Sequence, residues 1–145
     1  MNLVIDASVA IKWYLEEIHY EEADLALNKS YQLHAPEIIV PEFGSIVWKK
    51  QRSRQTTGQE AMKIIAAFTA QNIILHSQKN LLKHAFEGAV KTGQTVYDWM
   101  YLSLAFSLSC KLITADQKFY EAIKKTSFKN YIHWIKEAAT LENYN

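Results

Sequence analysis

The sequence predicts one α/β domain over residues 1–145, built on a parallel sheet that is covered by helices. The run from Leu3 to Ile5 is short, apolar and β-branched at its end, which is typical of a strand buried on both faces. It stops at a carboxylate, Asp6, and residues 9–13 then suit a helix. Short apolar runs keep alternating with helical patterns along the chain, and strands separated by helices pair in parallel.

Each later element follows from periodicity and from the residues at its ends. The predicted strands are short apolar runs, at residues 3–5, 33–35, 72–76, 111–114 and 131–133. The predicted helices carry apolar side chains every three to four positions, at residues 9–13, 21–31, 41–50, 59–70, 80–91, 95–109, 117–125 and 135–142. Pro36 ends a strand, Pro41 fits a first helical turn, and Gly58 and Gly93 lie at breaks between elements.

The composition excludes several classes of protein. A chain of 145 residues buries enough surface to fold without a covalent staple, and its one cysteine, Cys110, allows neither an internal disulfide nor a cysteine zinc site. We expect Cys110 to be a small buried residue before a strand. No apolar run reaches the roughly 20 residues of a membrane span, and no signal peptide is evident, so we expect a cytoplasmic protein without membrane attachment. The net charge of +1 gives no overall attraction to nucleic acid.

Four carboxylates lie where predicted elements begin or end. Asp6 and Asp116 each follow a strand and precede a helix, so both are expected at the carboxyl edge of the sheet, where folds of this kind bind ligands. Glu42 lies in a first helical turn, and Asp98 lies three residues after Thr95 as in a capping box. Asp98 reaches the same edge only if neighbouring elements direct its helix there.

A cluster of these four carboxylates requires a cation or protonation. Two unit charges about 4 Å apart repel by roughly 4 kcal/mol at an effective dielectric near 20. An all-oxygen ligand set suits Mg²⁺ or Mn²⁺, and a water bound to such an ion can attack a phosphodiester. The alternative is that the four acids are independent helix caps, with Asp6 as the N-cap of the helix that follows it.

Four segments together resemble the PIN-domain family, and in particular the VapC-type toxins of toxin–antitoxin pairs. They are residues 4–13 (VIDASVAIKW), 40–43 (VPEF), 95–105 (TVYDWMYLSLA) and 112–119 (LITADQKF). They occur in the family's order, span nearly the whole chain and supply an acid at each position where the family has one. Two departures are mild: Trp99 stands where a small residue is usual and is expected to crowd the helix face near the site, and Cys110 stands where Gly or Ala is common.

The resemblance implies a PIN-like three-layer α/β/α sandwich with a central parallel sheet of four or five strands. It implies a Mg²⁺- or Mn²⁺-dependent endoribonuclease that acts as the toxin of a type II pair, with an RNA substrate, an antitoxin protein as partner and a homodimer as assembly. The family's acids correspond to Asp6, Glu42, Asp98 and Asp116, with Asp6, Asp98 and Asp116 as metal ligands, and Ser8 and Thr114 correspond to polar residues that order them. The alternative is a catalytically silent PIN-like module that binds RNA or protein.

Two further groups of side chains have both a functional and a structural interpretation. The densest basic group either binds RNA phosphates beside the site or is a solvated helix end; it consists of Lys49, Lys50, Arg52 and Arg54. Several aromatic side chains either stack on bases or pack in the core or an interface: Trp13, Tyr14, Trp48, Trp99 and Tyr101. The apolar faces around Trp99 and Tyr101 exceed what one sheet face is expected to cover, which favours the dimer. The histidines share no helical ligand spacing, so none is assigned to the metal.

Overall fold

A computed structural model of the chain describes residues 1–27 and 30–143. Within these residues the strands form one five-stranded parallel sheet in the order β3-β2-β1-β4-β5. The strands are β1 (Asn2–Ile5), β2 (Gln32–Pro36), β3 (Ile73–His76), β4 (Lys111–Thr114) and β5 (Ile132–Trp134). The predicted α/β/α sandwich with a parallel sheet is confirmed, and the sheet has five strands.

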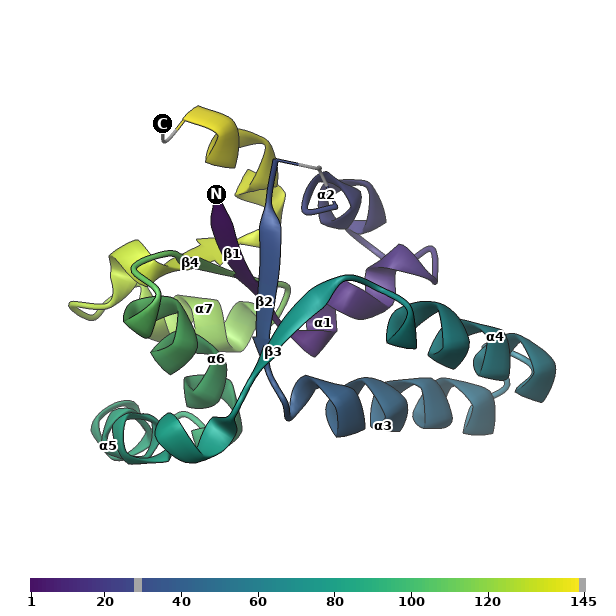
Figure 1. The fold of residues 1–145 in the computed structure, drawn as a ribbon, viewed down its shortest axis with the longest axis horizontal. Coiled ribbons are helices and arrows are strands. Elements are labelled where there is room, and N and C mark those ends of the chain that lie inside the picture. Colours follow the sequence, from purple (N-terminus) through teal and green to yellow (C-terminus); the bar gives the residue numbers. More distant parts are fainter. Residues whose placement is uncertain (28–29, 144–145) are drawn as a thin grey trace.

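Helices cover both faces of the sheet (Figure 1). One layer follows β1 and β2 and consists of α1 (Ala7–Ala10), α2 (Tyr20–Leu25), α3 (Ile39–Arg52) and α4 (Gly58–Thr69). The other follows β3 and β4 and consists of α5 (Leu82–Thr92), α6 (Val96–Ser107) and α7 (Gln117–Ile123). The strand order explains this division. The chain runs outward from β1 to β3 and then returns across the sheet to β4, and right-handed crossovers in the two directions place their helices on opposite faces.

The central strand, β1, is buried and leads directly to the first acid, Asp6, at the carboxyl edge of the sheet. Leu3, Val4 and Ile5 have no exposed surface, as expected for a strand that pairs on both sides and is covered on both faces. β1 pairs in parallel with β2 on one side and with β4 on the other. The carboxyl ends of β1 and β4 are therefore neighbours, and the residues that follow these two strands meet.

Helix α6 is enclosed between the sheet and α5. It contacts β1, β2 and β4 on one side and α5 on the other, so it is apolar around most of its circumference. Trp99 is fully buried against Gly88 of α5, and Tyr101 is also buried. Trp99 therefore does not crowd the site, which corrects that expectation. The apolar surplus expected around Trp99 and Tyr101 is covered within the chain and gives no support to a dimer.

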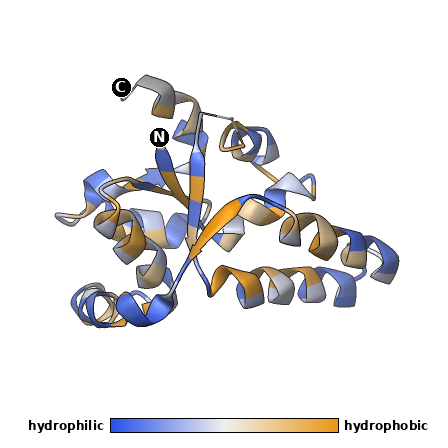
Figure 2. Ribbon diagram, viewed as in Figure 1, coloured by the Kyte–Doolittle hydropathy of each residue, from blue (hydrophilic) through white to orange (hydrophobic). Residues whose placement is uncertain are grey.

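The antiparallel pair of α3 and α4 extends away from the sheet (Figure 1). Thr57 and Glu60 form a capping box at the start of α4, in which each side chain accepts a hydrogen bond from the other residue's backbone N–H. Phe43 and Phe68 stack between the helices with ring centroids 3.8 Å apart. Figure 2 shows that hydrophobic residues gather toward the sheet, whereas the far end of this pair is more hydrophilic.

The boundaries of the predicted elements agree with the structure to within two residues, with three exceptions. The first helix begins at Ala7, because Asp6 caps it, and continues as the 3₁₀ helix η1 (Ile11–Trp13). The helix expected at residues 21–31 corresponds to α2, which ends at Leu25; residues 28–29 lie outside the described residues. The helix expected at residues 135–142 is the 3₁₀ helix η4 (Ile135–Asn143). Two further 3₁₀ turns precede α5 and β5, η2 (Gln78–Asn80) and η3 (Lys129–Tyr131).

Three further properties of the described residues complete the account of the fold. Among the described residues, no helix combines the length and the apolar character that crossing a membrane requires. Cys110 is half-buried rather than buried, and its partial burial raises the pKa of the thiol to about 11. Helix α5 exposes three large apolar side chains at a spacing of four residues, Leu82, Phe86 and Val90.

Candidate active site

Asp6 lies between β1 and α1. Its Oδ1 accepts hydrogen bonds from the Val9 backbone N–H (3.0 Å) and the Ser8 hydroxyl (2.5 Å), and its Oδ2 accepts one from the Thr114 hydroxyl (2.5 Å). Asp6 is therefore a helix N-cap, as the structural alternative required. A carboxylate has about four acceptor positions, so three donors fix its orientation and leave capacity for one further ligand.

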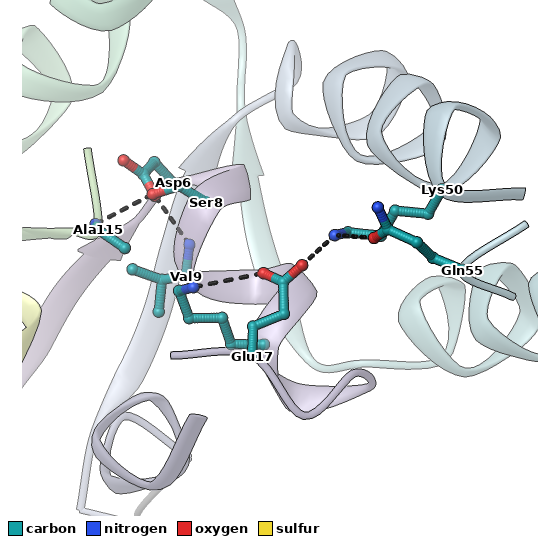
Figure 3. A network of polar contacts seen from close by, with 8 residues as sticks. Asp6, Ser8, Val9, Glu17, Lys50, Gln55 and Ala115 are labelled. Atoms are coloured by element: carbon teal, nitrogen blue, oxygen red, sulfur yellow. Dashed lines mark hydrogen bonds and ion pairs between the residues drawn. The ribbon is translucent and has the colours of Figure 1, made fainter. Parts of the chain in front are cut away.

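The same hydroxyls connect the end of β1 to the segment after β4. Ser8 Oγ accepts a hydrogen bond from the Ala115 backbone N–H at 3.0 Å (Figure 3). Thr114 Oγ1 accepts one from the Asp116 N–H at 3.0 Å, and Asp116 in turn caps α7. The predicted ordering role of Ser8 and Thr114 thus has a structural basis: they set the position of Asp116 relative to Asp6.

Asp98 lies in the first turn of α6. The Thr95 hydroxyl accepts a hydrogen bond from the Asp98 N–H (3.1 Å) and donates one to Asp98 Oδ2 (2.7 Å). The packing of α6 between the sheet and α5 directs its N-terminus to the carboxyl edge. A carboxylate at this end of a helix is favoured by the helix dipole. The hydrogen bonds to Thr95 therefore fix the position of Asp98, and the helix dipole stabilises its negative charge.

Glu42 approaches from α3, in the opposite helical layer, and contacts Tyr101 of α6. The Tyr101 hydroxyl donates a hydrogen bond of 2.5 Å to Glu42 Oε2. Burial, and then the charge of Glu42, raise the pKa of Tyr101 far above its usual range. The tyrosine therefore stays protonated, remains a donor to Glu42 and leaves Glu42 Oε1 without this contact.

These side chains surround one open pocket of about 260 Å³. Its lining includes all four acids that the sequence singled out, together with residues of α1, α3 and α6: Asp6, Ala7, Ser8, Glu42, Ser45, Ile46, Lys49, Asp98, Tyr101 and Asp116. The four acids are thus helix-start residues and members of one site at the same time. Asp6 and Asp116 cap α1 and α7, whereas Thr95 caps α6 and α3 has no side-chain cap. The alternative of four independent caps therefore describes two of the acids and misses the convergence of all four.

Burial and mutual repulsion weaken the acidity of the cluster. Burial raises the pKa of Asp6 to about 6, and the charge of Asp116 adds to the rise, although the hydroxyl and amide donors oppose it. Burial also raises the pKa of Glu42 and of Asp98, with contributions from Asp98 and Asp116 respectively. Raised carboxylate pKa values in a polar pocket are a signature of functional sites.

These shifts predict how the metal-free protein responds to pH. Asp6 has a folded pKa of about 6, above its ordinary value of 3.8, so the folded state binds the proton more tightly than the unfolded state. The resulting stabilisation is complete below the unfolded pKa and is lost as pH rises through about 6. In EDTA, the free energy of unfolding by urea should fall by on the order of 2–3 kcal/mol between pH 4 and pH 7 because of Asp6.

Asp6→Asn should remove this part of the pH dependence. The relevant readout is the slope of the free energy of unfolding against pH. The absolute free energy is less informative, because the amide of Asn also alters the bonds to Ser8 and Thr114. An equal slope in wild type and variant would contradict the assignment to Asp6.

The side chains of the pocket are of the kind that a divalent cation such as Mg²⁺ prefers. Its acids offer only oxygen ligands, and their repulsion favours a bound positive charge. In residues 1–27 and 30–143, no three His, Cys, Asp or Glu side chains are grouped closely enough to enclose an ion by themselves. Mg²⁺ suits such an open arrangement because it keeps several waters and takes only one or two protein carboxylates.

The basic group predicted to bind RNA divides into separate parts. Lys49 lines the pocket. Lys50 instead points to Glu17 (Figure 3), and Glu17 also pairs with Lys12. Arg52 lies over the ring of Trp48, and Arg54 occupies the turn after α3 with a left-handed φ of 62°. The ion pair with Glu17 thus separates Lys50 from the other basic side chains, and RNA binding by this group stays a prediction.

Sequence reasoning missed three residues with a bearing on the site. The sequence suggests only stacking or packing for Tyr101, yet its hydroxyl donates a hydrogen bond to Glu42. Ser45 lies one helical turn after Glu42, a spacing that could have identified it. The charge of Lys118 opposes the rise in the pKa of Asp98 that burial causes; Lys118 lies two residues after Asp116, a signal too weak to find it.

The fold and this carboxylate pocket agree with the comparison to known families. The chain belongs to the PIN-domain family, whose model matches residues 3–125. It is 32% identical over 123 residues to the ribonuclease VapC3 of Pyrobaculum aerophilum, a match that covers 83% of this chain and 94% of that protein.

Solved structures share the fold at lower identity. PAE2754 from Pyrobaculum aerophilum has a TM-score of 0.71 and 21% identity, covering 99% of this chain and 90% of its own. VapC20 of Mycobacterium tuberculosis, a toxin that cleaves the sarcin–ricin loop, has a TM-score of 0.63 and 13% identity, covering 83% and 94%. VapBC2 from Rickettsia felis, solved with a DNA fragment from its promoter, has a TM-score of 0.62 and 13% identity, covering 92% and 98%.

Proposed function

We propose that this chain is a Mg²⁺- or Mn²⁺-dependent endoribonuclease that hydrolyses RNA phosphodiester bonds. The observation that carries the proposal is the convergence of Asp6, Glu42, Asp98 and Asp116 on one open pocket. The similarity to a protein named ribonuclease VapC3 supports the choice of RNA as substrate. A catalytically silent module would have no need for four converging acids, whose repulsion costs stability.

In this proposal Asp6, Asp98 and Asp116 would hold the cation at the edge of the sheet, in part through its bound waters, since the described carboxylates are not grouped closely enough to enclose it by themselves. When bound, the cation would lower the pKa of a water and stabilise negative charge on the phosphate. Glu42 Oε1 accepts the proton that the attacking water loses, and Tyr101 keeps the other oxygen of Glu42 in place. Ser8, Thr114 and Thr95 hold the aspartates in fixed orientations, which reduces the reorganisation needed during the reaction.

We also propose that the chain is the toxin of a type II toxin–antitoxin pair and forms a homodimer. The similarity to VapC3 and the shared fold of the VapBC2 structure support an antitoxin partner, a segment of which would lie over the acidic pocket. The exposed apolar side chains of α5 support the dimer. Light scattering that gives a monomer across micromolar concentrations would contradict it.

The test of the nuclease is cleavage of a panel of structured RNAs by the purified chain. We expect cleavage in millimolar Mg²⁺ or Mn²⁺ and none in EDTA, with activity restored by added metal. Equal cleavage in EDTA would contradict metal dependence. A folded protein that Mn²⁺ stabilises but that cuts none of the RNAs would favour the silent module instead.

A further inference from the structure

The face of α3 that starts at Glu42 continues outward from the acidic pocket. Each residue of an α-helix turns it by about 100° and advances it by about 1.5 Å. Lys49 is therefore within about 20° of Glu42 around the axis and about 10 Å further along it. Ser45 and Lys49 both line the pocket, which shows that this face of α3 forms one wall of the site and continues beyond the acids.

Lys49 differs from its neighbour Lys50 in having no internal partner. Lys50 is directed about 100° away from Lys49 and pairs with Glu17, where both side chains are largely covered. Lys49 is exposed, and within the described part of the chain it makes no ion pair. An ammonium group thus stands beside an acidic pocket without being bound to any described carboxylate, so it is available to an anionic ligand.

On the exposed side of α3, the indole ring of Trp48 lies next to the positive charge of Arg52. Trp48 is 54% exposed, and the guanidinium carbon of Arg52 lies 5.3 Å from the centre of its ring. Arg52 lies about 60° from Lys49 around the helix and Trp48 about 100°, both on the side away from Lys50. An exposed indole beside a cation combines base stacking with attraction to phosphate, as surfaces that bind single-stranded nucleic acid do.

We propose that Ser45, Lys49, Trp48 and Arg52, here called the α3 strip, bind the single-stranded RNA that flanks the bond cleaved at the acids. Lys49 contacts a phosphate next to the scissile one, and Trp48 with Arg52 receives a neighbouring base. The inference rests on the proposed ribonuclease function and adds that the substrate is unpaired where it crosses α3, because a base stacks on a side chain only when it leaves its own helix.

The test is a binding titration of a fluorescently labelled single-stranded RNA, followed by anisotropy in EDTA over a series of NaCl concentrations. Lys49→Ala should reduce the slope of log K against log salt by about 0.7, the value for one phosphate contact with a single strand. Trp48→Ala should weaken binding by at least about fivefold without changing the slope, because it removes stacking and no charge. Lys63→Ala, which removes an exposed lysine of the neighbouring α4, should leave the slope unchanged.

The outcomes separate this inference from the proposed function. A wild type that cleaves RNA in Mg²⁺ while Lys49→Ala and Lys63→Ala give identical slopes overturns the α3 strip alone. A wild type that binds RNA with the expected slopes but never cleaves it supports the strip and contradicts the nuclease. If a polyglutamate peptide binds as tightly as the RNA, and Trp48→Ala weakens neither interaction, the α3 strip is not an RNA-binding surface. That result would favour an acidic protein as its ligand. Thermal melts confirm that each variant is folded.

Discussion

Replacing Asp98 by Asn is expected to reduce RNA cleavage by at least about 100-fold, the usual loss when a group acting directly in proton transfer or metal binding is removed. Asn keeps the size of the side chain and can still accept the hydrogen bond from the Thr95 hydroxyl, so α6 keeps its start. The change removes one negative charge from the cation site. It also relieves the repulsion that involves Asp116, so the variant in EDTA should melt at the same temperature as wild type or higher.

The matched control is Asp24→Asn, which changes the one aspartate of the chain that lies outside the site, on the exposed side of α2. This variant should cleave RNA like wild type. Thermal melts with added Mn²⁺ supply a second readout: wild type and Asp24→Asn should be stabilised, because a ligand that binds only the folded state raises the melting temperature, and Asp98→Asn should gain much less. An Asp98→Asn protein as active as wild type would refute the role of this acid.

Replacing Gly88 by Ala is expected to destabilise the protein although Ala is the better helix former. A Cβ at position 88 would lie 2.2 Å from Cδ2 of Trp99, so α5 would have to move away from α6. Trp99 cannot yield easily, because its ring contacts Phe128 and its Nε1 donates a hydrogen bond of 2.8 Å to Thr92. The expected loss is about 1–3 kcal/mol in the free energy of unfolding by urea, the usual cost of overpacking.

Gly44→Ala is the control for this prediction, since Gly44 also lies inside a helix but has open space around its missing Cβ. There the higher helix propensity of Ala acts alone and should stabilise the protein by about 0.5–1 kcal/mol. Combining Gly88→Ala with Trp99→Leu should cost less than the sum of the two single changes, because the residues are in contact. The clash would be shown to be absent if Gly88→Ala stabilised the protein as Gly44→Ala does. The same conclusion would follow if the free-energy changes of Gly88→Ala and Trp99→Leu were strictly additive in the double variant.

The candidate site was accessible from the sequence because its acids obey local rules. Asp6 and Asp116 follow short apolar runs that are typical of a buried strand, and the spacing of Thr95 and Asp98 is that of a helix start. Parallel pairing then brings the residues after β1 and β4 to one edge whatever the details of packing. For the same reason the strands and most helices were predicted to within two residues.

The sequence alone therefore determined which elements form and which acids begin the helices after β1 and β4, since these depend on interactions between residues close along the chain. The alternation of strands with helices determined that the sheet is parallel. Tertiary structure decided the rest. The direction of the α6 axis depends on how α6 packs between the sheet and α5. The position of Asp98 at the carboxyl edge of the sheet follows from that direction. The pairing of Lys50 with Glu17, and the bond from Tyr101 to Glu42, depend on partners from distant segments. Contacts of this kind arise only when packing has set the helices against the sheet, and local periodicity carries no information about them.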